Sequence, residues 1–254
     1  MKQSHYFETT ESTNNLLKEM TRHESLPEGT LVYTDFQTAG KGQPGNAWES
    51  EKGKNLLFSI LLYPHNIPIS RQFILSQITC LAIKNVLDKY TDGISIKWSN
   101  DIYWKEKKIC GILIENTLKR DKIDTCIIGV GLNINQEIFT GSAPNPVSLC
   151  QIVGKELEKE EILSDIYSQL FYLYKNMDQE KIQKNYHENL YRKEGFHPYV
   201  DSLTKESFLA RIENVEADGK LILITDKGER REYYFKEVIA PPNLPEGRLS
   251  RREI

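Results

Sequence analysis

The apolar residues of this chain follow two different spacings, which together predict a sheet with helices packed on it. From about Ser70 to Tyr90 the apolar residues recur at helical spacing. Apolar runs typical of β-strands with at least one buried face occur at 6–9, 31–34, 55–62, 95–98, 108–115 and 125–133. Strands grouped in this way, with few helices between them, favour an α+β fold with a mixed or antiparallel sheet.

Capping residues mark where two further helical regions begin. Ser12 or Thr13 can cap a helix whose apolar residues follow at once, because a side-chain oxygen at this position can accept a hydrogen bond from a free backbone N–H. Ser148 and Gln151, three residues apart, form a capping box. Helical spacing then continues to about Tyr191.

Near residue 195 the spacing of apolar residues changes from helical to strand-like. Short strand-like runs follow, separated by Asp-Gly and Lys-Gly turns at 218–219 and 227–228, and they predict a small β-barrel-like domain. The last residues are polar and have little apolar area to bury, so we expect them to fray. We therefore predict three parts: a larger domain over 1–192, a smaller one over 193–242 and a tail over 243–254.

Composition excludes several classes of partner. The 33 basic residues are offset by 36 acidic ones, giving a net charge of −3, and they are scattered along the chain. We therefore expect no DNA or other nucleic-acid partner. No apolar signal region opens the chain, and no stretch approaches the ~18 apolar residues that span a membrane. These features predict a soluble, cytoplasmic protein without a membrane partner.

The four cysteines, Cys80, Cys110, Cys126 and Cys150, stand far apart, with no pair at metal-ligand spacing. At least two lie inside apolar runs, so we interpret them as small buried hydrophobic residues in a reducing compartment. The five histidines fall into no metal-binding or catalytic-triad spacing either. We therefore predict no metal site made by the protein's own side chains.

Two segments carry the candidate chemistry. Residues 97–115 are interpreted as a hairpin of two apolar runs whose mouth carries charges of both signs. Residues 40–45 contain three glycines, whose backbone N–H groups could close around a phosphate or carboxylate. Lys41 would add charge there, and Trp48 offers a flat face for a purine. The spacing is not that of a Walker loop, and a mobile surface turn is the alternative interpretation.

Together these motifs resemble those of biotin protein ligases. Lys97–Asp101 is similar to the family's Lys-Trp-Pro-Asn-Asp signature, with Ser99 in place of the proline. Lys108, followed by Gly111, Ile112 and Glu115, continues the family pattern in register, and residues 129–135 are a further match in order. The glycine-rich loop ending in tryptophan is also similar. It departs from the family at Lys41 and Gln43, where arginine is usual or common, and at Pro44.

The resemblance implies a catalytic domain like those of biotin ligases and class II aminoacyl-tRNA synthetases, with a small C-terminal SH3-like barrel. It also implies a two-step reaction. Biotin and Mg·ATP would give biotinyl-5′-AMP and pyrophosphate, and a lysine of a biotin carrier domain, part of a biotin-dependent carboxylase, would then attack the anhydride. Mg²⁺ would sit mainly on phosphate oxygens. The protein would be a monomer or a homodimer.

The resemblance further implies roles for single residues. Lys108 and Lys41 would be catalytic. The biotin-binding positions would be Ser12, Thr13, Asn14, Gln37, Gly40, Lys41, Gly42, Gln43, Lys108 and Gly111. The nucleotide-binding positions would be Trp48, Asn100, Asp101 and Asn133.

Three other functions have distinguishing features. A lipoate protein ligase would carry an Arg-Arg…Gly-Gly-Gly signature followed by His-Asp, which this sequence lacks. A biotin-responsive repressor would carry a helix-turn-helix module, for which the motif beginning at Ser12 is expected to leave no room. A non-catalytic nucleotide-binding module would be favoured if Lys108 proved dispensable.

Overall fold

The structure, a computed structural model, describes residues 3–43, 45–141 and 145–241. Pro44 and the tail predicted for 243–254 lie outside the described residues. Backbone contacts divide the chain into two compact units, and the boundary along the sequence falls between Tyr191 and Arg192. The larger unit combines a sheet with helices, whereas the smaller unit is built from strands.

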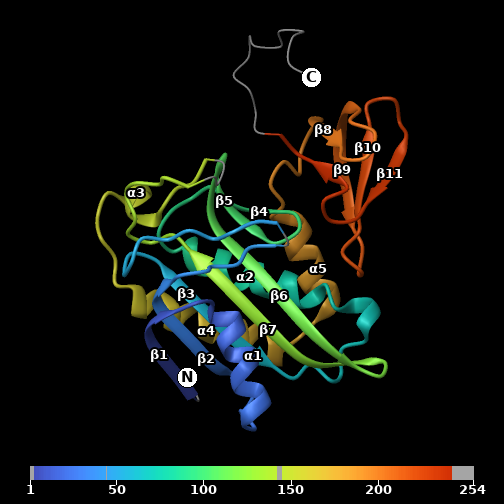
Figure 1. Ribbon diagram of the computed structural model, residues 1–254. Helices are drawn as coiled ribbons and strands as arrows, with labels where there is room; N and C mark the ends of the chain where they lie inside the picture. Colours follow the sequence, from blue (N-terminus) through green and yellow to red (C-terminus); the bar gives the residue numbers. More distant parts are fainter. Residues whose placement is uncertain (1–2, 44, 142–144, 242–254) are drawn as a thin grey trace. The chain divides into compact units, whose positions relative to one another are not determined.

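Within the described residues, the strands of the larger unit form one mixed sheet in the order β1-β2-β3-β7-β6-β5-β4 (Figure 1). β1 pairs parallel with β2, and the other neighbours pair antiparallel. The strands are β1 (Gln3–Thr10), β2 (Thr30–Gln37), β3 (Leu56–Leu62), β4 (Ile94–Lys97), β5 (Asp101–Trp104), β6 (Lys107–Lys119) and β7 (Lys122–Leu132). The predicted α+β class and the hairpin within 97–115 are confirmed.

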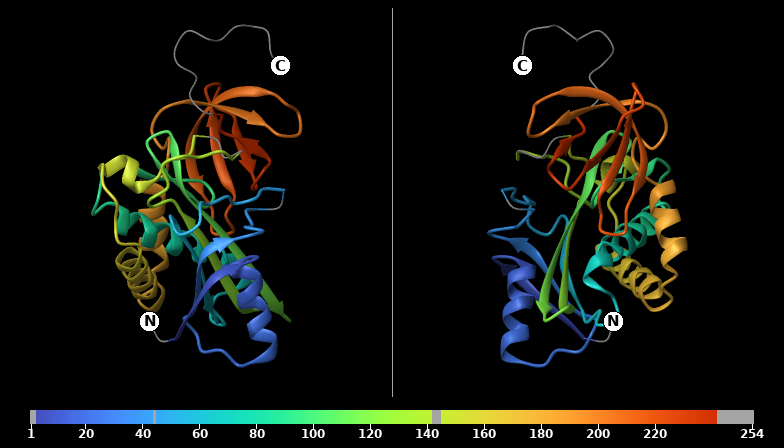
Figure 2. Two further views of the ribbon diagram at one scale, coloured as in Figure 1. Left: turned by 60° about the vertical axis from the view of Figure 1, so that its left-hand side comes forward. Right: turned by 90° about the vertical axis from the view of Figure 1, so that its right-hand side faces the viewer.

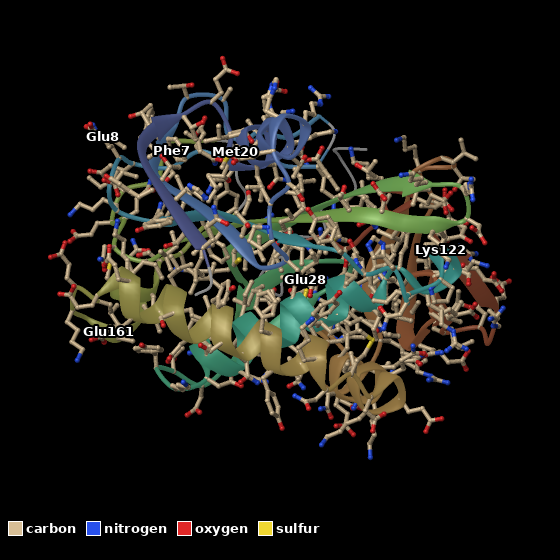
Figure 3. All side chains as sticks on the ribbon, turned by 90° about the horizontal axis from the view of Figure 1, so that it is seen from below. Phe7, Glu8, Met20, Glu28, Lys122 and Glu161 are labelled. Atoms are coloured by element: carbon tan, nitrogen blue, oxygen red, sulfur yellow. The ribbon has the colours of Figure 1, made fainter. Side chains whose placement is uncertain are left out.

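Helices lie on both faces of this sheet (Figures 1 and 3). On one face α1 (Thr13–His23) packs over β2, β3 and β7. On the other face α2 (Ile74–Leu87) packs over β4, β5 and β6, and α4 (Lys159–Lys175) and α5 (Gln179–Glu188) pack against α2. Short helices η1 (Ile69–Arg71) and α3 (Leu149–Val153) join these elements. α1 therefore covers only part of its face of the sheet.

The core of the larger unit follows from this layering. All seven residues of β3 are buried, because the strand has α1 on one face and the α2 side of the unit on the other. Leu17 of α1 packs with Val32 and Leu61 of the strands beneath it. Phe7 of β1 and Met20 of α1, both labelled in Figure 3, are partly buried and pack against that cluster.

Several predicted helix boundaries need correction. The helix expected from Ser70 to Tyr90 is the short η1 followed by α2, and the helical region up to Tyr191 is three helices. Gly154, with φ 76°, ends α3 in the left-handed conformation that glycine adopts without strain. The Ser148–Gln151 capping box is confirmed. Ser12 is at the N-cap of α1, but its hydroxyl makes no capping hydrogen bond.

The smaller unit is built from strands, drawn in orange to red in Figure 2. In the described residues they form an antiparallel sheet with the order β11-β10-β9-β8-β12. Its strands are β8 (His197–Asp201), β9 (Ser207–Val215), β10 (Leu221–Thr225), β11 (Arg230–Tyr233) and β12 (Val238–Ile239). The sequence prediction missed β8, which contains Pro198, and β12, which has two residues. In the part of the chain that the structure describes, no helix is both long enough and apolar enough to span a bilayer.

Candidate functional site

A bulge in β6 decides where Lys108 points. The neighbouring β5 residues Ile102 and Tyr103 pair with Cys110 and Lys108 of β6. Ile109, which lies between those two partners, is therefore an additional residue in β6. An additional residue reverses which face of the sheet the next side chain occupies. Lys108 therefore shares a face with Gly111, and its Cε lies 3.5 Å from where a Gly111 Cβ would be.

Lys108 forms an ion pair with Asp101, the first residue of β5. The Lys108 Nζ lies 2.7 Å from Asp101 Oδ2, and the two side chains are 21% and 30% exposed. Nζ also lies 5.8 Å from the centre of the Trp48 ring. A partly exposed pair of this kind has a small net free energy, so an anionic ligand can compete with Asp101 for the ammonium.

The turn between β4 and β5 is held from two sides. Asn100 donates from Nδ2 to the Ile112 carbonyl at 2.6 Å, and its Oδ1 accepts from Gln43 Nε2 at 2.9 Å. From the helical layer, the buried Tyr186 hydroxyl donates to the Ser99 carbonyl at 2.7 Å. Burial raises the pKa of Tyr186 well above its usual value, so this hydroxyl stays protonated. The turn is thus fixed to both sheet and helix.

Two facing glycines form a flat floor beside Lys108. Gly111 of β6 pairs directly with Gly131 of β7, and the Trp48 indole lies against both. A Cβ would come within 2.4 Å of the ring at Gly131 and within 2.9 Å at Gly111, so a larger residue at either position would displace the ring. Trp48 Nε1 is buried and has no hydrogen-bond partner among the described residues. The indole itself therefore covers this floor in the structure.

The start of α1 contributes a buried polar network to the same face. The Thr13 N–H donates to Gln37 Oε1 at 2.8 Å, and Asn14 Nδ2 donates to Glu115 Oε2 at 2.8 Å. Ser59 of β3 joins them, with its Oγ 2.7 Å from Thr13 Oγ1 and 2.6 Å from Asn14 Oδ1. Neighbouring Ser12 is also buried. One hydrogen-bond network therefore links three expected biotin-binding residues, with Thr13 in contact with Gln37 and joined to Asn14 through Ser59.

The glycine-rich loop is closed on itself by backbone hydrogen bonds. Gly40 accepts one at 2.9 Å and Gly42 donates one at 3.0 Å. Lys41 is exposed, and its Nζ donates to Asn15 Oδ1 of α1 at 2.7 Å. Within the described residues the structure gives Lys41 no contact with Lys108, so these two expected catalytic lysines are not brought together.

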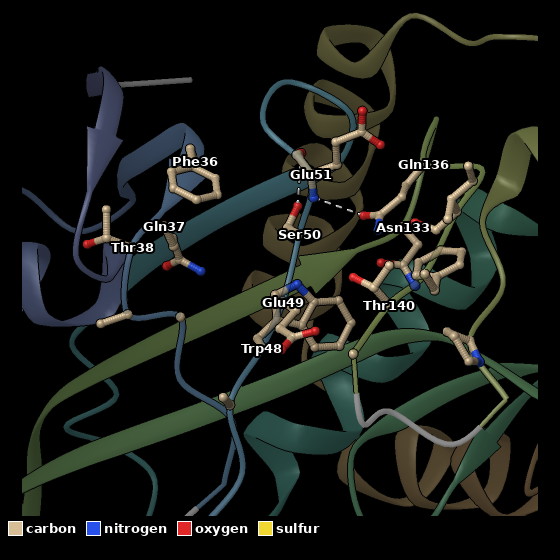
Figure 4. A pocket seen from close by; sticks show the side chains of 17 residues that line it. Phe36, Gln37, Thr38, Trp48, Glu49, Ser50, Glu51, Asn133, Gln136 and Thr140 are labelled. Carbon is tan, nitrogen blue, oxygen red and sulfur yellow. Dashed lines mark hydrogen bonds between the residues drawn. The ribbon is translucent and has the colours of Figure 1, made fainter.

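A cavity of about 720 Å³ opens beside Trp48, between the loop and the segment that follows β7 (Figure 4). Asn133 lines it, and its Nδ2 donates to the Val147 carbonyl at 3.1 Å. Its Oδ1 is buried and has no partner in the described part of the chain. Gln136 also lines the cavity and accepts from the Glu51 N–H at 3.0 Å. The residues that line the cavity thus include a flat ring and a buried amide oxygen without a partner in the described residues.

Two polar residues of this region were not predicted. Ser59 is the polar member of the otherwise apolar run at 56–62, which is the signal that could have revealed it. Gln136 follows the last matched motif directly and had no signal of its own. The other expected positions lie at the end of β2, on the glycine-rich loop, at the start of α1 and its N-cap, on the turn before β5 and its first residue, on β6, or directly after β7.

The chain belongs to the biotin/lipoate A/B protein ligase family, whose model matches residues 6–133. Among relatives, it is 32% identical to the bifunctional ligase/repressor BirA of Bacillus subtilis over 168 residues, which cover 63% of this chain and 50% of that protein. It is also 32% identical to the biotin–protein ligase of Homo sapiens over 136 residues, covering 51% of this chain and 18% of that protein. The chain spans about half the length of the first of these relatives, and less of the second.

Solved structures share the fold. The biotin protein ligase of Aquifex aeolicus in complex with biotin and ATP superposes with a TM-score of 0.78 at 23% identity, covering 96% of this chain and 100% of that chain. The biotin protein ligase of Leishmania major in complex with biotinyl-5-AMP gives a TM-score of 0.66 at 20% identity, covering 92% and 99% of the two chains. At these identities the likeness establishes the architecture.

Proposed function

We propose that this chain is a biotin protein ligase that acts in two steps. Biotin and ATP give biotinyl-5′-AMP and pyrophosphate, and the biotinyl group then passes to a lysine of a biotin carrier domain. The observation that carries this function is the position of Lys108, which the β6 bulge turns toward Asp101 beside the glycine floor. Family membership and the relatives named as ligases support the same activity.

The chemistry requires a cation at this point. Joining a carboxylate to the α-phosphate of ATP brings two anions together, and a preorganised ammonium stabilises the charge that grows in the transition state. In this mechanism Lys108 leaves Asp101 to bind both anions. No protein nucleophile is needed. The Cys110 thiol does not compete, because burial raises its pKa far above the usual value.

The biotin end of the site is proposed to include the α1 network. Thr13, Asn14 and Gln37 would bind the ring system, and the half-buried Gly111 would form the floor under it. Further contacts are proposed from the N-cap and the loop, at Ser12, Gly40, Lys41, Gly42 and Gln43. To act as a catalytic group, Lys41 would have to break its hydrogen bond with Asn15 and bind the ligand instead.

The nucleotide is proposed to occupy the cavity beside Trp48. The indole would stack on adenine, and the unused Oδ1 of Asn133 would accept a hydrogen bond from an amino group of the base. Asn100 and Asp101 would border the phosphates from the turn before β5. Mg²⁺ would enter with ATP and remain mainly on phosphate oxygens, because this ion keeps much of its water and binds few protein ligands.

The partner in the second step would be the carrier domain of a biotin-dependent carboxylase. We propose that the enzyme works in the cytoplasm, as a monomer or a homodimer. Its other task is to keep water away from the mixed anhydride until the carrier lysine attacks.

Biotin-dependent exchange of labelled pyrophosphate into ATP tests the first step without a carrier. We expect exchange with biotin and little with lipoate. Exchange with lipoate alone would instead favour the lipoate branch of the family, and exchange with neither acid would contradict an adenylating ligase. Mass spectrometry of a carrier domain after incubation with the enzyme, biotin and Mg·ATP then tests the transfer.

A further inference from the structure

In the buried network at the start of α1, the number of available protons determines which hydroxyl donates to which oxygen. Ser59 Oγ lies 2.6 Å from Asn14 Oδ1 and 2.7 Å from Thr13 Oγ1, and both distances are short enough to require a proton between the oxygens. A hydroxyl carries one proton, and an amide oxygen can only accept. The Ser59 proton therefore goes to Asn14, and the Thr13 proton must go to Ser59.

Glu115 keeps Asn14 in the orientation on which this order depends. The Asn14 amide has its Oδ1 toward Ser59 and its Nδ2 2.8 Å from Glu115 Oε2, and the Leu113 carbonyl accepts from the same Nδ2 at the longer distance of 3.4 Å. An ionised carboxylate accepts only, so Asn14 must present its NH₂ to Glu115 and its oxygen to Ser59. Strand register places Glu115 there, because it shares a face of β6 with Gly111, four residues earlier.

The glycine at the centre of the network leaves the room it needs. A Cβ at Gly129 of β7 would lie 2.2 Å from Asn14 Oδ1, so the Asn14 side chain can pass only over a glycine. Asn14, Thr13 and Ser59 are all buried, so bulk water does not supply alternative partners. The hydrogen-bond order is therefore set chiefly by Glu115 at the Asn14 end, and it leaves the Thr13 oxygen as an acceptor at the other end.

We infer that Glu115 is a positioning residue for ligand recognition: it makes the Thr13 hydroxyl an acceptor toward the ring of the acid substrate. The inference rests on the proposed function. With its proton directed to Ser59, the Thr13 hydroxyl cannot also donate to Gln37 Oε1, which lies 3.2 Å away. Thr13 Oγ1 and Gln37 Oε1 are then two neighbouring acceptors that one ligand N–H can bridge, and the Gln37 side chain lines the cavity. An acceptor in this place selects a ring N–H, such as that of a cyclic urea, and disfavours a ring oxygen.

A Glu115→Gln substitution replaces the nearer of the two acceptors that orient Asn14, and leaves only the longer contact with the Leu113 carbonyl. A glutamine can donate as well as accept, so Asn14 can turn over, Ser59 can donate to Thr13, and the Thr13 proton can face the ligand. The matched test ligands are biotin and its two cyclic carbamates, in which one or the other ring N–H is replaced by oxygen. Isothermal titration calorimetry gives the ratio of their dissociation constants for each protein.

For the wild type we expect biotin to bind at least about tenfold more tightly than one of the carbamates. In Glu115→Gln that ratio should fall to within about threefold, and Ser59→Ala, which cuts the chain in the middle, should do the same with Glu115 intact. Glu161→Gln, on the exposed side of α4, is the matched control and should keep the wild-type ratio. Thermal unfolding of each variant checks that it is folded.

The inference is overturned if the wild type does not discriminate, or if both variants keep the wild-type ratio. Failure of the ligase function has a separate signature. If the wild type binds biotin but does not catalyse pyrophosphate exchange, the proposed ligase activity is contradicted, whereas the ratios of dissociation constants still test the role of Glu115. A wild type that does not bind biotin would overturn both.

Discussion

At the scale of single residues, Lys108 is the side chain on which most of the proposed chemistry depends. Its neighbour Lys107 is exposed on the other face of β6, so the strand supplies a matched control. Lys108→Ala should leave the protein folded and slow biotin-dependent pyrophosphate exchange by about 10²–10³-fold, the usual effect of losing one preorganised charge-stabilising donor. Lys107→Ala should keep the wild-type rate. An unchanged rate in Lys108→Ala would show that this lysine is not catalytic.

The glycine floor gives a second prediction at this scale. Gly131→Ala would place a methyl group within the Trp48 ring, so the indole should move off the floor toward water. We expect the tryptophan emission of the free protein to shift to longer wavelength. The same substitution in a Trp48→Phe background should produce no such shift, since the remaining tryptophans lie elsewhere. A shift that persists without Trp48 would contradict the close contact.

At the scale of elements, the loop from Thr38 to Trp48 is the segment most expected to respond to ligands. Its three glycines make it costly in conformational entropy to order without a ligand, and Lys41 gives trypsin an exposed cleavage point. Biotin and Mg·ATP added together should slow cleavage after Lys41. Cleavage after the exposed Lys227, in the β10–β11 turn, is the internal control and should keep its rate. Equal protection at both positions, or at neither, would mean that the loop does not close over the ligands.

At the scale of the whole molecule, the buried thiols predict how stability depends on pH. Cys80, Cys110, Cys126 and Cys150 are all free and buried, and burial raises the pKa of the first three. Above about pH 8.5 the thiols of Cys80, Cys110 and Cys126 ionise in the unfolded chain and not in the folded one, so unfolding releases protons. The free energy of unfolding should therefore be retained below that pH and fall as pH rises above it. Urea unfolding at pH 7, 9 and 10 measures this, and Cys126→Ala should reduce the slope.

Charge gives a second prediction for the whole molecule. Nonspecific DNA affinity comes chiefly from counterions released when lysine and arginine neutralise phosphates, and this chain has a net charge of −3 with scattered basic residues. We expect no sequence-specific retention of DNA in a gel-shift titration at low salt, even with biotin and ATP present. Retention at nanomolar protein would reopen the repressor hypothesis.

The sequence alone was sufficient for the features that depend on local spacing. Apolar runs predicted six strands of the larger sheet, since burial selects such runs whatever the partner strand, and β5 was expected only as part of the hairpin within 97–115. The Ser148–Gln151 box lay within one turn of chain. The motif residues were likewise visible as residue types at fixed separations. Strands β8 and β12 were not predicted, because β8 contains a proline and β12 has only two residues, and each feature removes the usual strand signal.

Only the tertiary structure decided what depends on pairing between distant segments. The additional residue Ile109 becomes visible only against β5, yet it determines the face on which Lys108 lies. The pairing of Gly111 with Gly131 makes two separate glycines into one floor, and Ser59 joins the α1 network from a strand about 45 residues away. Strand register has a period of two, so a slip of one residue would have moved each of these groups to the opposite face of the sheet.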